Sequence, residues 1–254
     1  MSSSFERHIR LTGAFNVRDL GGYPVAGGGT TRWRSMLRAD GLHGLDENDV
    51  ERLLELGLRT VVDLRSNAEL ANQPSPFAAH AVVAYRHVPL FEALAPVDML
   101  TTGAGTFELA ERYADAADRC RPALVKVIEE IDDAPQDGIV LFNCSAGKDR
   151  TGLVAAMLLS LAGVHGDEIA ADYALTGSIA APLLERLKGQ ALKRGLDEAI
   201  ATRLLACQPA TMHSLLRHVD GRYGGFSAYL ADGGVERRRI DRIGARLRDA
   251  VAAE

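Results

Sequence analysis

The sequence predicts an α/β fold, in which a central and mostly parallel sheet is flanked by helices and followed by a helical C-terminal region. Three observations lead to this prediction. Short β-branched or apolar runs at 59–64, 84–88 and 138–143 alternate with stretches of helical pattern. The run at 138–143 is apolar and bounded by turn residues, which favours a buried parallel strand over an edge strand. Beyond Thr151 the pattern is almost entirely helical.

The N-terminal part of the chain predicts extended structure and turns. Residues 16–24 are expected to form a short extended stretch that enters a turn. Three consecutive glycines at 27–29 are expected at the tip of a hairpin, and residues 30–35 are expected to form its returning strand.

Two helical segments before the run at 138–143 have recognisable ends. Asp46 is expected to cap a helix over 47–56, which Gly57 ends. Residues 107–133 also have a helical pattern, and Pro122 is expected to open a second helix within them.

The remainder of the chain predicts a series of helices. Amphipathic patterns at 197–207 and 234–253 each predict one helix. Gly177, Gly189 and Gly195 are expected to separate the helices of this region.

Composition and charge restrict the classes of protein to which the chain can belong. A net charge of −5 argues against a large nucleic-acid-binding face, so no nucleic-acid partner is expected. Cys120, Cys144 and Cys207 fit neither a zinc cluster nor a disulfide framework, and the seven histidines lack metal-ligand spacing, so no metal is expected. Sparse cysteines, an N-terminus without an apolar run, and a longest apolar run too short to span a bilayer (153–164) predict a cytoplasmic protein without stable membrane insertion. Export by a non-classical route would leave the same features.

The segment NCSAGKDRTG at 143–152 joins the predicted strand to the next helix. Gly147 permits a tight bend that turns successive backbone N–H groups inward, which makes a concave anion-binding site. The following helix adds its unpaired N–H groups, Arg150 adds a planar fork and Lys148 adds a second cation. The residues expected to bind a phosphate are therefore Ser145, Ala146, Gly147, Lys148, Asp149, Arg150 and Thr151.

Cys144 lies at the floor of this loop and is the expected catalytic nucleophile. The helix N-terminus and the cations Lys148 and Arg150 favour its thiolate form. A thiolate directed at a bound phosphate attacks phosphorus in line and forms a cysteinyl-phosphate intermediate. Thr151 is placed to hydrogen-bond the sulfur when it leaves in the second step. A buried structural thiol is the alternative, and it is the better interpretation only for a cysteine that lacks such a loop.

Cys144 and Arg150 match the Cys-(any five)-Arg signature of the protein tyrosine phosphatase superfamily. The string AGKDRTG at 146–152 resembles the atypical tyrosine and dual-specificity phosphatases of bacteria and fungi, some of which dephosphorylate phosphoinositides. Similar motifs follow in the family's order: NVRDLGG at 16–22, Arg34-Ser35, VVDLRS at 61–66, and YGGF at 223–226 with Tyr229-Leu230. The resemblance implies a tyrosine-phosphatase-like fold, no cofactor, and phosphorylated proteins or phosphoinositides as substrates.

The resemblance also implies how the chain is divided. A single phosphatase domain, 1–254, is expected, and in this family a helical insertion after the catalytic helix can cover the active site. The expected parts are an N-terminal segment 1–45, an α/β core 46–176 with the catalytic loop 144–150, a helical lid 177–209 and C-terminal helices 210–254. Plain packing of the helices at 177–209 is the alternative to a lid.

The general acid is left open between two aspartates. The only tryptophan, Trp33, is followed by Arg34, so the chain has no Trp-Pro-Asp acid loop. The resemblance attributes the acid to Asp149, and Asp63 of the Asp-Leu-Arg motif is the second candidate. The alternatives are that Asp149 caps the helix and that Asp63 forms a structural ion pair with Arg65.

Asn143 and Lys148 modify the expected activity. The family usually has histidine before the cysteine, whereas Asn143 supplies amide hydrogen bonds but no charge. A lower activity or a higher pH optimum is therefore expected. Lys148 is expected at the rim of the loop, where a second cation favours substrates with more than one phosphate. A solvated surface lysine is the alternative.

Three other functions compete with phosphate ester hydrolysis. A nucleotide-binding loop would need glycine in place of Phe142, and Ser or Thr in place of Asp149. A rhodanese-like sulfurtransferase also uses a cysteine loop, but the run Gly-Lys-Asp-Arg-Thr-Gly favours phosphate esters. A catalytically weak phosphate- or phosphoinositide-binding protein remains as the alternative, because of Asn143. The sequence makes no prediction of the oligomeric state.

Overall fold

A five-stranded sheet in the order β1-β2-β5-β3-β4 forms the centre of the computed structural model, which describes residues 6–92 and 108–249. β1 is antiparallel to β2, and the other neighbouring pairs are parallel. The strands are β1 (Arg18–Asp19), β2 (Met36–Ala39), β3 (Leu58–Asp63), β4 (Ala84–His87) and β5 (Ile139–Asn143). The predicted α/β fold with a mostly parallel sheet is confirmed.

β5 lies at the middle of the sheet, and both of its faces are covered. Val140 and Phe142 belong to the larger hydrophobic core, whereas Ile139 and Leu141 belong to a second core. Side chains alternate between the two faces of a strand, so burial on both faces explains why the run is apolar throughout. The parallel strands β2, β5 and β3 end side by side, so the loop that follows β5 leaves from the carboxyl edge of the sheet.

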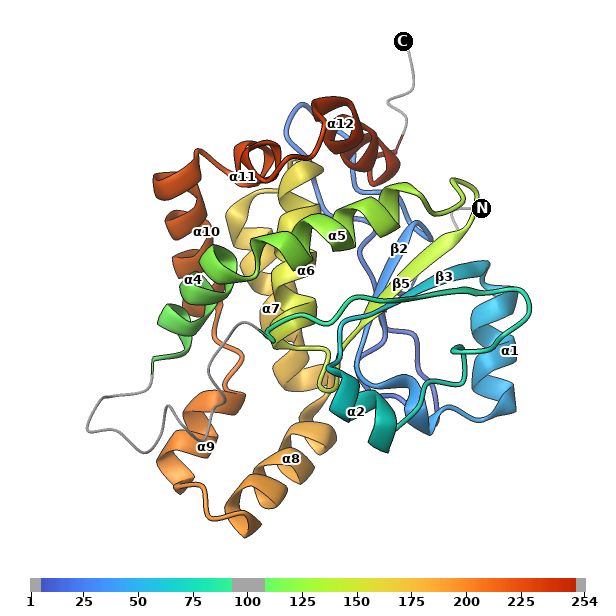
Figure 1. Cartoon of the computed structure of the whole chain (residues 1–254), viewed down its shortest axis with the longest axis vertical. Helices are drawn as coiled ribbons and strands as arrows, with labels where there is room; N and C mark the ends of the chain where they lie inside the picture. Colours follow the sequence, from blue (N-terminus) through green and yellow to red (C-terminus); the bar gives the residue numbers. More distant parts are fainter. Residues whose placement is uncertain (1–5, 93–107, 250–254) are drawn as a thin grey trace.

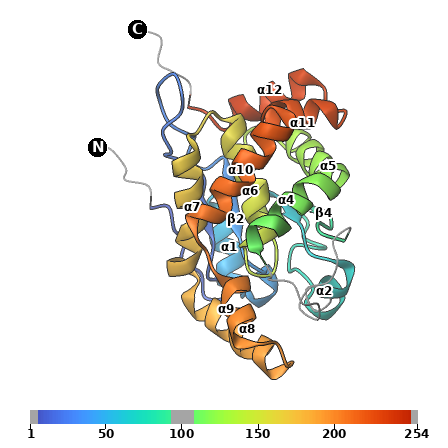
Figure 2. The same ribbon diagram turned by 90° about the vertical axis from the view of Figure 1, so that its left-hand side faces the viewer.

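Helices cover both faces of the sheet, with α5 and α6 on one face and α1 on the other (Figure 1). The helices are α1 (Glu47–Glu55), α2 (Asn67–Asn72), α4 (Leu109–Arg119), α5 (Arg121–Asp132), α6 (Asp149–Leu161), α7 (Gly166–Ile179), α8 (Ala181–Lys193), α9 (Glu198–Leu205), α10 (Pro209–Tyr223), α11 (Phe226–Asp232) and α12 (Arg237–Arg246). α6 is buried on all sides from Thr151 to Leu159, which accounts for the apolar run at 153–164. Figures 1 and 2 show α2, α8 and α9 at one end of the molecule.

The predicted helix ends before the sheet's central strand are largely confirmed. The Asp46 side chain accepts a hydrogen bond from the Asp49 backbone and caps α1, and Gly57 follows the helix with a φ of +103°. Pro122 lies in the first turn of α5. α4 begins at Leu109, and the first position of the predicted helix, residue 107, lies outside the described residues.

The predicted returning strand at 30–35 is wrong. These residues form only isolated bridges, Pro24 with Thr30 and Thr31 with Arg248, and the strand of the sheet is β2, directly after them. Arg34 has a φ of +58°, which interrupts an extended strand and lets the chain turn into the sheet at Ser35. The sequence pattern did not indicate β2, because the charged Arg38 interrupts an otherwise apolar run that is buried throughout.

Two of the three glycines expected between helices lie inside them. Gly177 is within α7 and Gly189 is within α8, whereas Gly195 separates α8 from α9 with a φ of +87°. α7 instead gives way to α8 at Pro182, which lies in the first turn of α8 and has no N–H to continue the preceding helix. The amphipathic patterns at 197–207 and 234–253 correspond to α9 and α12, and residues 250–253 lie outside the described part of the chain.

Candidate active site

The loop from Cys144 to Lys148 joins β5 to α6, as the sequence predicts. Cys144 directly follows β5 and is 2% exposed. Gly147 has a φ of +64°, and a Cβ at this position would lie 2.7 Å from the backbone of Ala39 and Asp40. Both the backbone conformation and the close approach to β2 therefore require glycine here.

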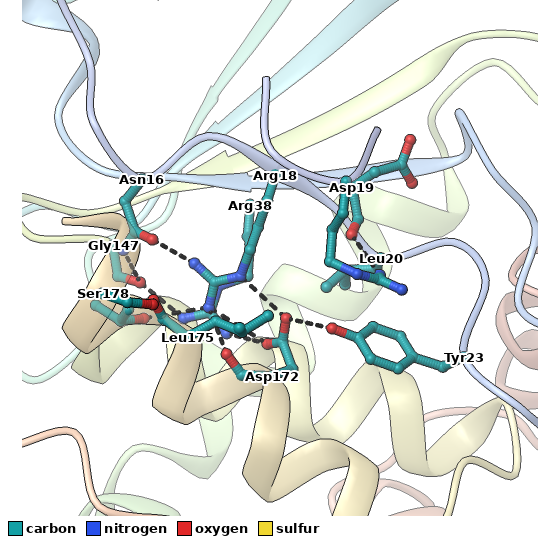
Figure 3. A network of polar contacts seen from close by, with 12 residues as sticks. Asn16, Arg18, Asp19, Leu20, Tyr23, Arg38, Gly147, Asp172, Leu175 and Ser178 are labelled. Carbon is teal, nitrogen blue, oxygen red and sulfur yellow. Dashed lines mark hydrogen bonds and ion pairs between the residues drawn. The ribbon is translucent and has the colours of Figure 1, made fainter. Parts of the chain in front are cut away.

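The carbonyl groups of this loop are held from the side of β1 and β2. Arg38 on β2 donates to the Gly147 carbonyl at 2.7 Å. The Asn16 amide donates to the Ala146 and Gly147 carbonyls at 3.0 and 3.1 Å. Figure 3 shows Asn16 and Arg38 beside Gly147. Neither contact was predicted from the sequence; the position of Asn16 at the start of the NVRDLGG motif was the one available signal.

Arg150 is paired with a glutamate that the sequence reasoning did not single out. Its two terminal nitrogens donate to the two carboxylate oxygens of Glu69 at 2.6 and 2.7 Å, and one also lies 3.3 Å from the Ser145 hydroxyl. That hydroxyl also hydrogen-bonds Glu69. Burial raises the pKa of Glu69, but hydrogen bonds and charge from Arg150 outweigh burial and hold this pKa well below its usual range. The Arg150 guanidinium thus already binds an anionic carboxylate.

Glu69 is positioned by the start of α2. Ser66 caps this helix and accepts from the Glu69 backbone, while the Ser66 backbone donates to the Glu69 carboxylate at 2.8 Å. This reciprocal capping box, Ser-x-x-Glu directly after Asp-Leu-Arg, was the signal in the sequence that would have located Glu69.

Lys148 does not lie at the rim of the loop. Its side chain is fully buried, and its ammonium group donates to the Leu204 carbonyl at 2.5 Å and lies 3.0 Å from the Asp149 carboxylate. The expectations of a rim cation and of a solvated surface lysine are therefore both wrong. The reason is tertiary: the end of α9 covers this position and accepts the hydrogen bond.

Asp149 is the first residue of α6 and lines the pocket described below. Its carboxylate accepts a hydrogen bond from the Tyr113 hydroxyl at 2.9 Å, and its side chain is 33% exposed. Burial, followed by the charge of Asp149, raises the pKa of Tyr113 well above its usual value. The N-cap position of α6 is Lys148, and no side chain caps this helix. Asp149 is the first residue within the helix, so it does not act as the cap.

Asp63 lies at the end of β3 and is fully buried. Its carboxylate accepts from the Arg65 guanidinium at 2.7 and 3.0 Å and from the Tyr85 hydroxyl at 3.0 Å. Burial and the neighbouring Asp63 charge raise the pKa of Tyr85. The structure thus brings Asp63 together with Arg65 as an ion pair, and Asp63 is not among the residues that line the pocket.

A pocket of about 440 Å³ opens onto the loop, where it is lined by Ala146, Asp149 and Arg150. Its apolar wall consists of Leu90, Phe91, Leu109, Leu187, Ala191, Leu204 and Leu205. Its other polar lining residues are Ser66, Glu69, Glu92, Arg112 and Tyr113. Because α8 and α9 supply four of the apolar residues, the segment expected as a lid forms one wall of this pocket. A mostly apolar cleft with converging charges at one end suits a phosphate ester with an apolar organic group.

Asn143, which ends β5 and directly precedes Cys144, and Thr151, which lies in the first turn of α6, are both fully buried. Within residues 6–92 and 108–249, the side-chain amide nitrogen and oxygen of Asn143 have no hydrogen-bond partner, and the Thr151 hydroxyl has none either. Thr151 therefore has a hydroxyl to offer a further acceptor. In the same ranges, no group of three or more His, Cys, Asp or Glu side chains is arranged to hold a metal ion. No helix of the described residues is both long and apolar enough to cross a membrane.

The chain matches known proteins over most of its length. The model described as "Tyrosine phosphatase family" matches residues 9–249. A tyrosine-protein phosphatase of Nostoc commune is 32% identical over 232 residues, which cover 85% of this chain and 75% of that protein. The triple specificity protein phosphatase PtpB of Mycobacterium tuberculosis is 26% identical over 275 residues, covering 92% of this chain and 96% of that protein. Among solved structures, TpbA of P. aeruginosa has a TM-score of 0.30 and 18% identity, covering 84% of this chain and 87% of that chain.

Proposed function

The chain belongs to the tyrosine phosphatase family, and on this premise we propose that it hydrolyses phosphate monoesters through a cysteinyl-phosphate formed on Cys144. One observation carries the proposal. Cys144 and Arg150 lie at the two ends of a sharply bent loop that begins at the carboxyl edge of the sheet, enters a helix N-terminus and opens into the pocket. Such a loop binds a tetrahedral dianion through backbone N–H groups, the helix dipole and the guanidinium.

The first step transfers the phosphoryl group to the protein. The Cys144 thiolate attacks phosphorus, and the new S–P bond forms as the bond from phosphorus to the ester oxygen breaks. Asp149 gives a proton to the departing oxygen, since it lines the pocket beside Arg150 whereas Asp63 is buried in its pair with Arg65. The phosphate and the departing charge are stabilised by the loop N–H groups and by Arg150.

The second step releases inorganic phosphate. A water molecule attacks the phosphorus of the cysteinyl-phosphate, gives a proton to the Asp149 carboxylate, and the S–P bond breaks. Thr151, whose buried hydroxyl has no partner within the described residues, donates to the departing sulfur. This scheme needs no metal ion or cofactor.

Phosphotyrosine is the first substrate class of the proposal, with phosphoserine, phosphothreonine and phosphoinositides as further classes. The likeness to a triple specificity protein phosphatase supports activity on more than one class of phosphorylated substrate. The apolar walls of the pocket support an aromatic or otherwise apolar group next to the phosphate. We further propose one phosphatase domain in which α8 and α9 act as the lid, and the three free cysteines support a reducing compartment, the cytoplasm.

A catalytically weak phosphate-binding protein is the second candidate. The observation that favours it is Asn143, which replaces the usual histidine with an amide that is buried and lacks a partner among the described residues. Such a protein would bind phosphate and vanadate without turnover.

A turnover assay separates the two candidates. We expect hydrolysis of an aryl phosphate by the full chain, inhibition by vanadate and no effect of EDTA. Cys144→Ser is expected to abolish turnover while keeping phosphate affinity, and Arg150→Lys is expected to impair both, because an ammonium cannot form the two-point contact. Binding of phosphate by the wild type without any hydrolysis would support the second candidate, and hydrolysis by Cys144→Ser would rule out Cys144 as the nucleophile.

A further inference from the structure

A buried polar network lies behind the loop and ends on its carbonyl groups (Figure 3). Arg38 reaches the Gly147 carbonyl at 2.7 Å, and Asn16 reaches the Ala146 and Gly147 carbonyls at 3.0 and 3.1 Å. The side chains of Asn16 and Arg38 are fully buried. Two donors from the N-terminal part of the chain therefore converge on two consecutive peptide groups of the loop.

These contacts orient the N–H groups of the same peptide planes. In a trans peptide, the carbonyl and the N–H of one plane point in opposite directions. Fixing the Ala146 carbonyl toward Asn16 directs the Gly147 N–H away from the network, and fixing the Gly147 carbonyl does the same for the Lys148 N–H. These two N–H groups belong to the loop that is proposed to surround the phosphate, so Asn16 and Arg38 can determine its shape without touching the phosphate.

Arg38 is itself held in place by Asp172 on α7. The Asp172 carboxylate accepts from Arg38 at 2.5 Å, from Arg18 at 3.0 Å and from the Tyr23 hydroxyl at 2.9 Å. Arg18 in turn donates to the Asn16 side-chain oxygen, which closes the network on the second donor. Two buried guanidinium groups share one carboxylate, and each also binds further acceptors, so neither can move alone without leaving a buried charge unpaired.

We propose that Arg38 and Asn16 are positioning residues for phosphate binding, which hold the Gly147 and Lys148 N–H groups in the orientation that the phosphate requires, with Asp172 fixing Arg38. This inference rests on the proposed function, because it assigns to the loop the task of binding phosphate. The strongest competing explanation is that the network only stabilises the fold. The two explanations differ in whether the folded variants still bind phosphate normally.

A matched control is available in Arg246, a second buried arginine that donates to backbone carbonyls. Its four hydrogen bonds go to the carbonyls of residues 131, 134, 135 and 138, ahead of β5 and so at the opposite end of this strand from the loop. Removing the guanidinium of Arg246 should therefore reduce stability without changing the loop.

The experiment compares Arg38→Met with Arg246→Met in the full chain. Calorimetric affinity for inorganic phosphate and the inhibition constant of vanadate are measured at a temperature where circular dichroism shows each variant folded. We expect Arg38→Met to weaken the binding of both phosphate and vanadate by about tenfold or more, which is equivalent to the loss of one or two hydrogen bonds. Arg246→Met should leave the binding of both anions within about twofold of the wild type. The lysine of Arg38→Lys can reach the Gly147 carbonyl or Asp172, but it lacks the planar fork that contacts both. The phosphate and vanadate affinities of this variant should therefore lie between those of Arg38→Met and the wild type.

Asn16→Ala provides the second test and decides the matter if Arg38→Met does not fold. It removes the Asn16 contacts to both carbonyls and the Asn16 oxygen that accepts from Arg18, and it keeps Arg38 on the Gly147 carbonyl and both ion pairs of Asp172. Normal phosphate and vanadate affinity in the folded variants, accompanied only by a lower melting temperature, would overturn the inference. Failure of the proposed function gives a different result, in which the wild type itself neither binds phosphate nor hydrolyses an aryl phosphate.

Discussion

The Glu69 carboxylate and the Arg150 guanidinium form a two-point ion pair, with N–O distances of 2.6 and 2.7 Å, between α2 and the first turn of α6. The guanidinium that the sequence assigns to the phosphate therefore already has an anionic partner. Glu69 remains charged across the neutral range, because Arg150 outweighs the effect of burial on the pKa of Glu69. A phosphate entering the loop has to share Arg150 with Glu69 or displace it.

Replacing Glu69 by glutamine should strengthen phosphate binding. Glu69→Gln removes a negative charge beside the phosphate dianion and keeps one acceptor for Arg150, so we expect the inhibition constant of inorganic phosphate to fall about three- to tenfold at low salt. The matched control is Glu92→Gln, which removes an exposed carboxylate from the same pocket and should have a smaller effect. Weaker phosphate binding by Glu69→Gln would show instead that the carboxylate positions Arg150 for the phosphate.

The proposed role of Asp149 as general acid predicts a dependence on the leaving group. Asp149→Asn keeps an acceptor for the Tyr113 hydroxyl but cannot donate a proton, so kcat should fall by about 10²- to 10⁴-fold on phosphotyrosine. The loss should be much smaller on an aryl phosphate whose leaving group needs no protonation. Asp63→Asn is expected to lower stability without changing the dependence on the leaving group. The reverse result, with the dependence changed only by Asp63→Asn, would assign the acid to Asp63.

The buried position of Lys148 changes what its substitution should do. Because the ammonium contacts the Leu204 carbonyl and Asp149, Lys148→Met should reduce kcat/KM by a similar factor on a small aryl phosphate and on a multiply phosphorylated inositide. Arg112, which does line the pocket, provides the comparison: Arg112→Met should cost more on the inositide, most of all at low salt. A larger loss on the inositide for Lys148→Met would mean that the lysine leaves Leu204 when substrate binds.

Asn143 predicts a change in the pH profile. Asn143→His introduces an imidazole that can carry a positive charge near Cys144, which favours the thiolate, so the acidic limb of kcat/KM should move to lower pH. The profile is measured on a single aryl phosphate, with Thr60→Val as a control for the removal of another buried polar atom that lacks a partner within the described residues. An unchanged acidic limb would show that the loop N–H groups and Arg150 already determine the ionisation of the thiol.

Asp172 predicts a loss of stability in acid. Burial raises the pKa of Asp172, but Arg18 and Arg38 outweigh burial and hold this pKa below its usual value near 4. The ion pairs of Asp172 therefore stabilise the fold above about pH 4. This stabilisation is lost as the pH falls toward the folded-state pKa. Asp172→Asn should be less stable than the wild type at pH 7, and its free energy of unfolding, measured in urea, should decline less between pH 5 and pH 3. Tyr23→Phe keeps the Asp172 carboxylate, so its free energy of unfolding should decline in parallel with that of the wild type. Equal acid dependence of Asp172→Asn and the wild type would contradict the prediction.

Local patterns predicted much of the fold. The strands β3, β4 and β5 lie within one residue of the predicted runs, since β-branched and apolar residues bounded by turn residues suffice to define a short buried strand. Asp46 and Pro122 marked helix starts because capping and proline geometry depend on adjacent backbone alone. β2 was misplaced because its burial of Arg38 depends on Asp172, 134 residues away, and not on its own sequence.

The sequence by itself predicted the bent loop between β5 and α6, because seven consecutive residues carry the bend, the cations and the helix start. The same residues are the source of the proposals that Cys144 is the nucleophile and that Arg150 binds the phosphate. Only the tertiary structure decided what surrounds them. Glu69 pairs with Arg150 across 81 positions, Lys148 turns to Leu204 across 56, and Arg38 reaches Gly147 across 109. Such contacts depend on which elements pack together in three dimensions, and a buried charge is stabilised only by the partners that this packing brings to it.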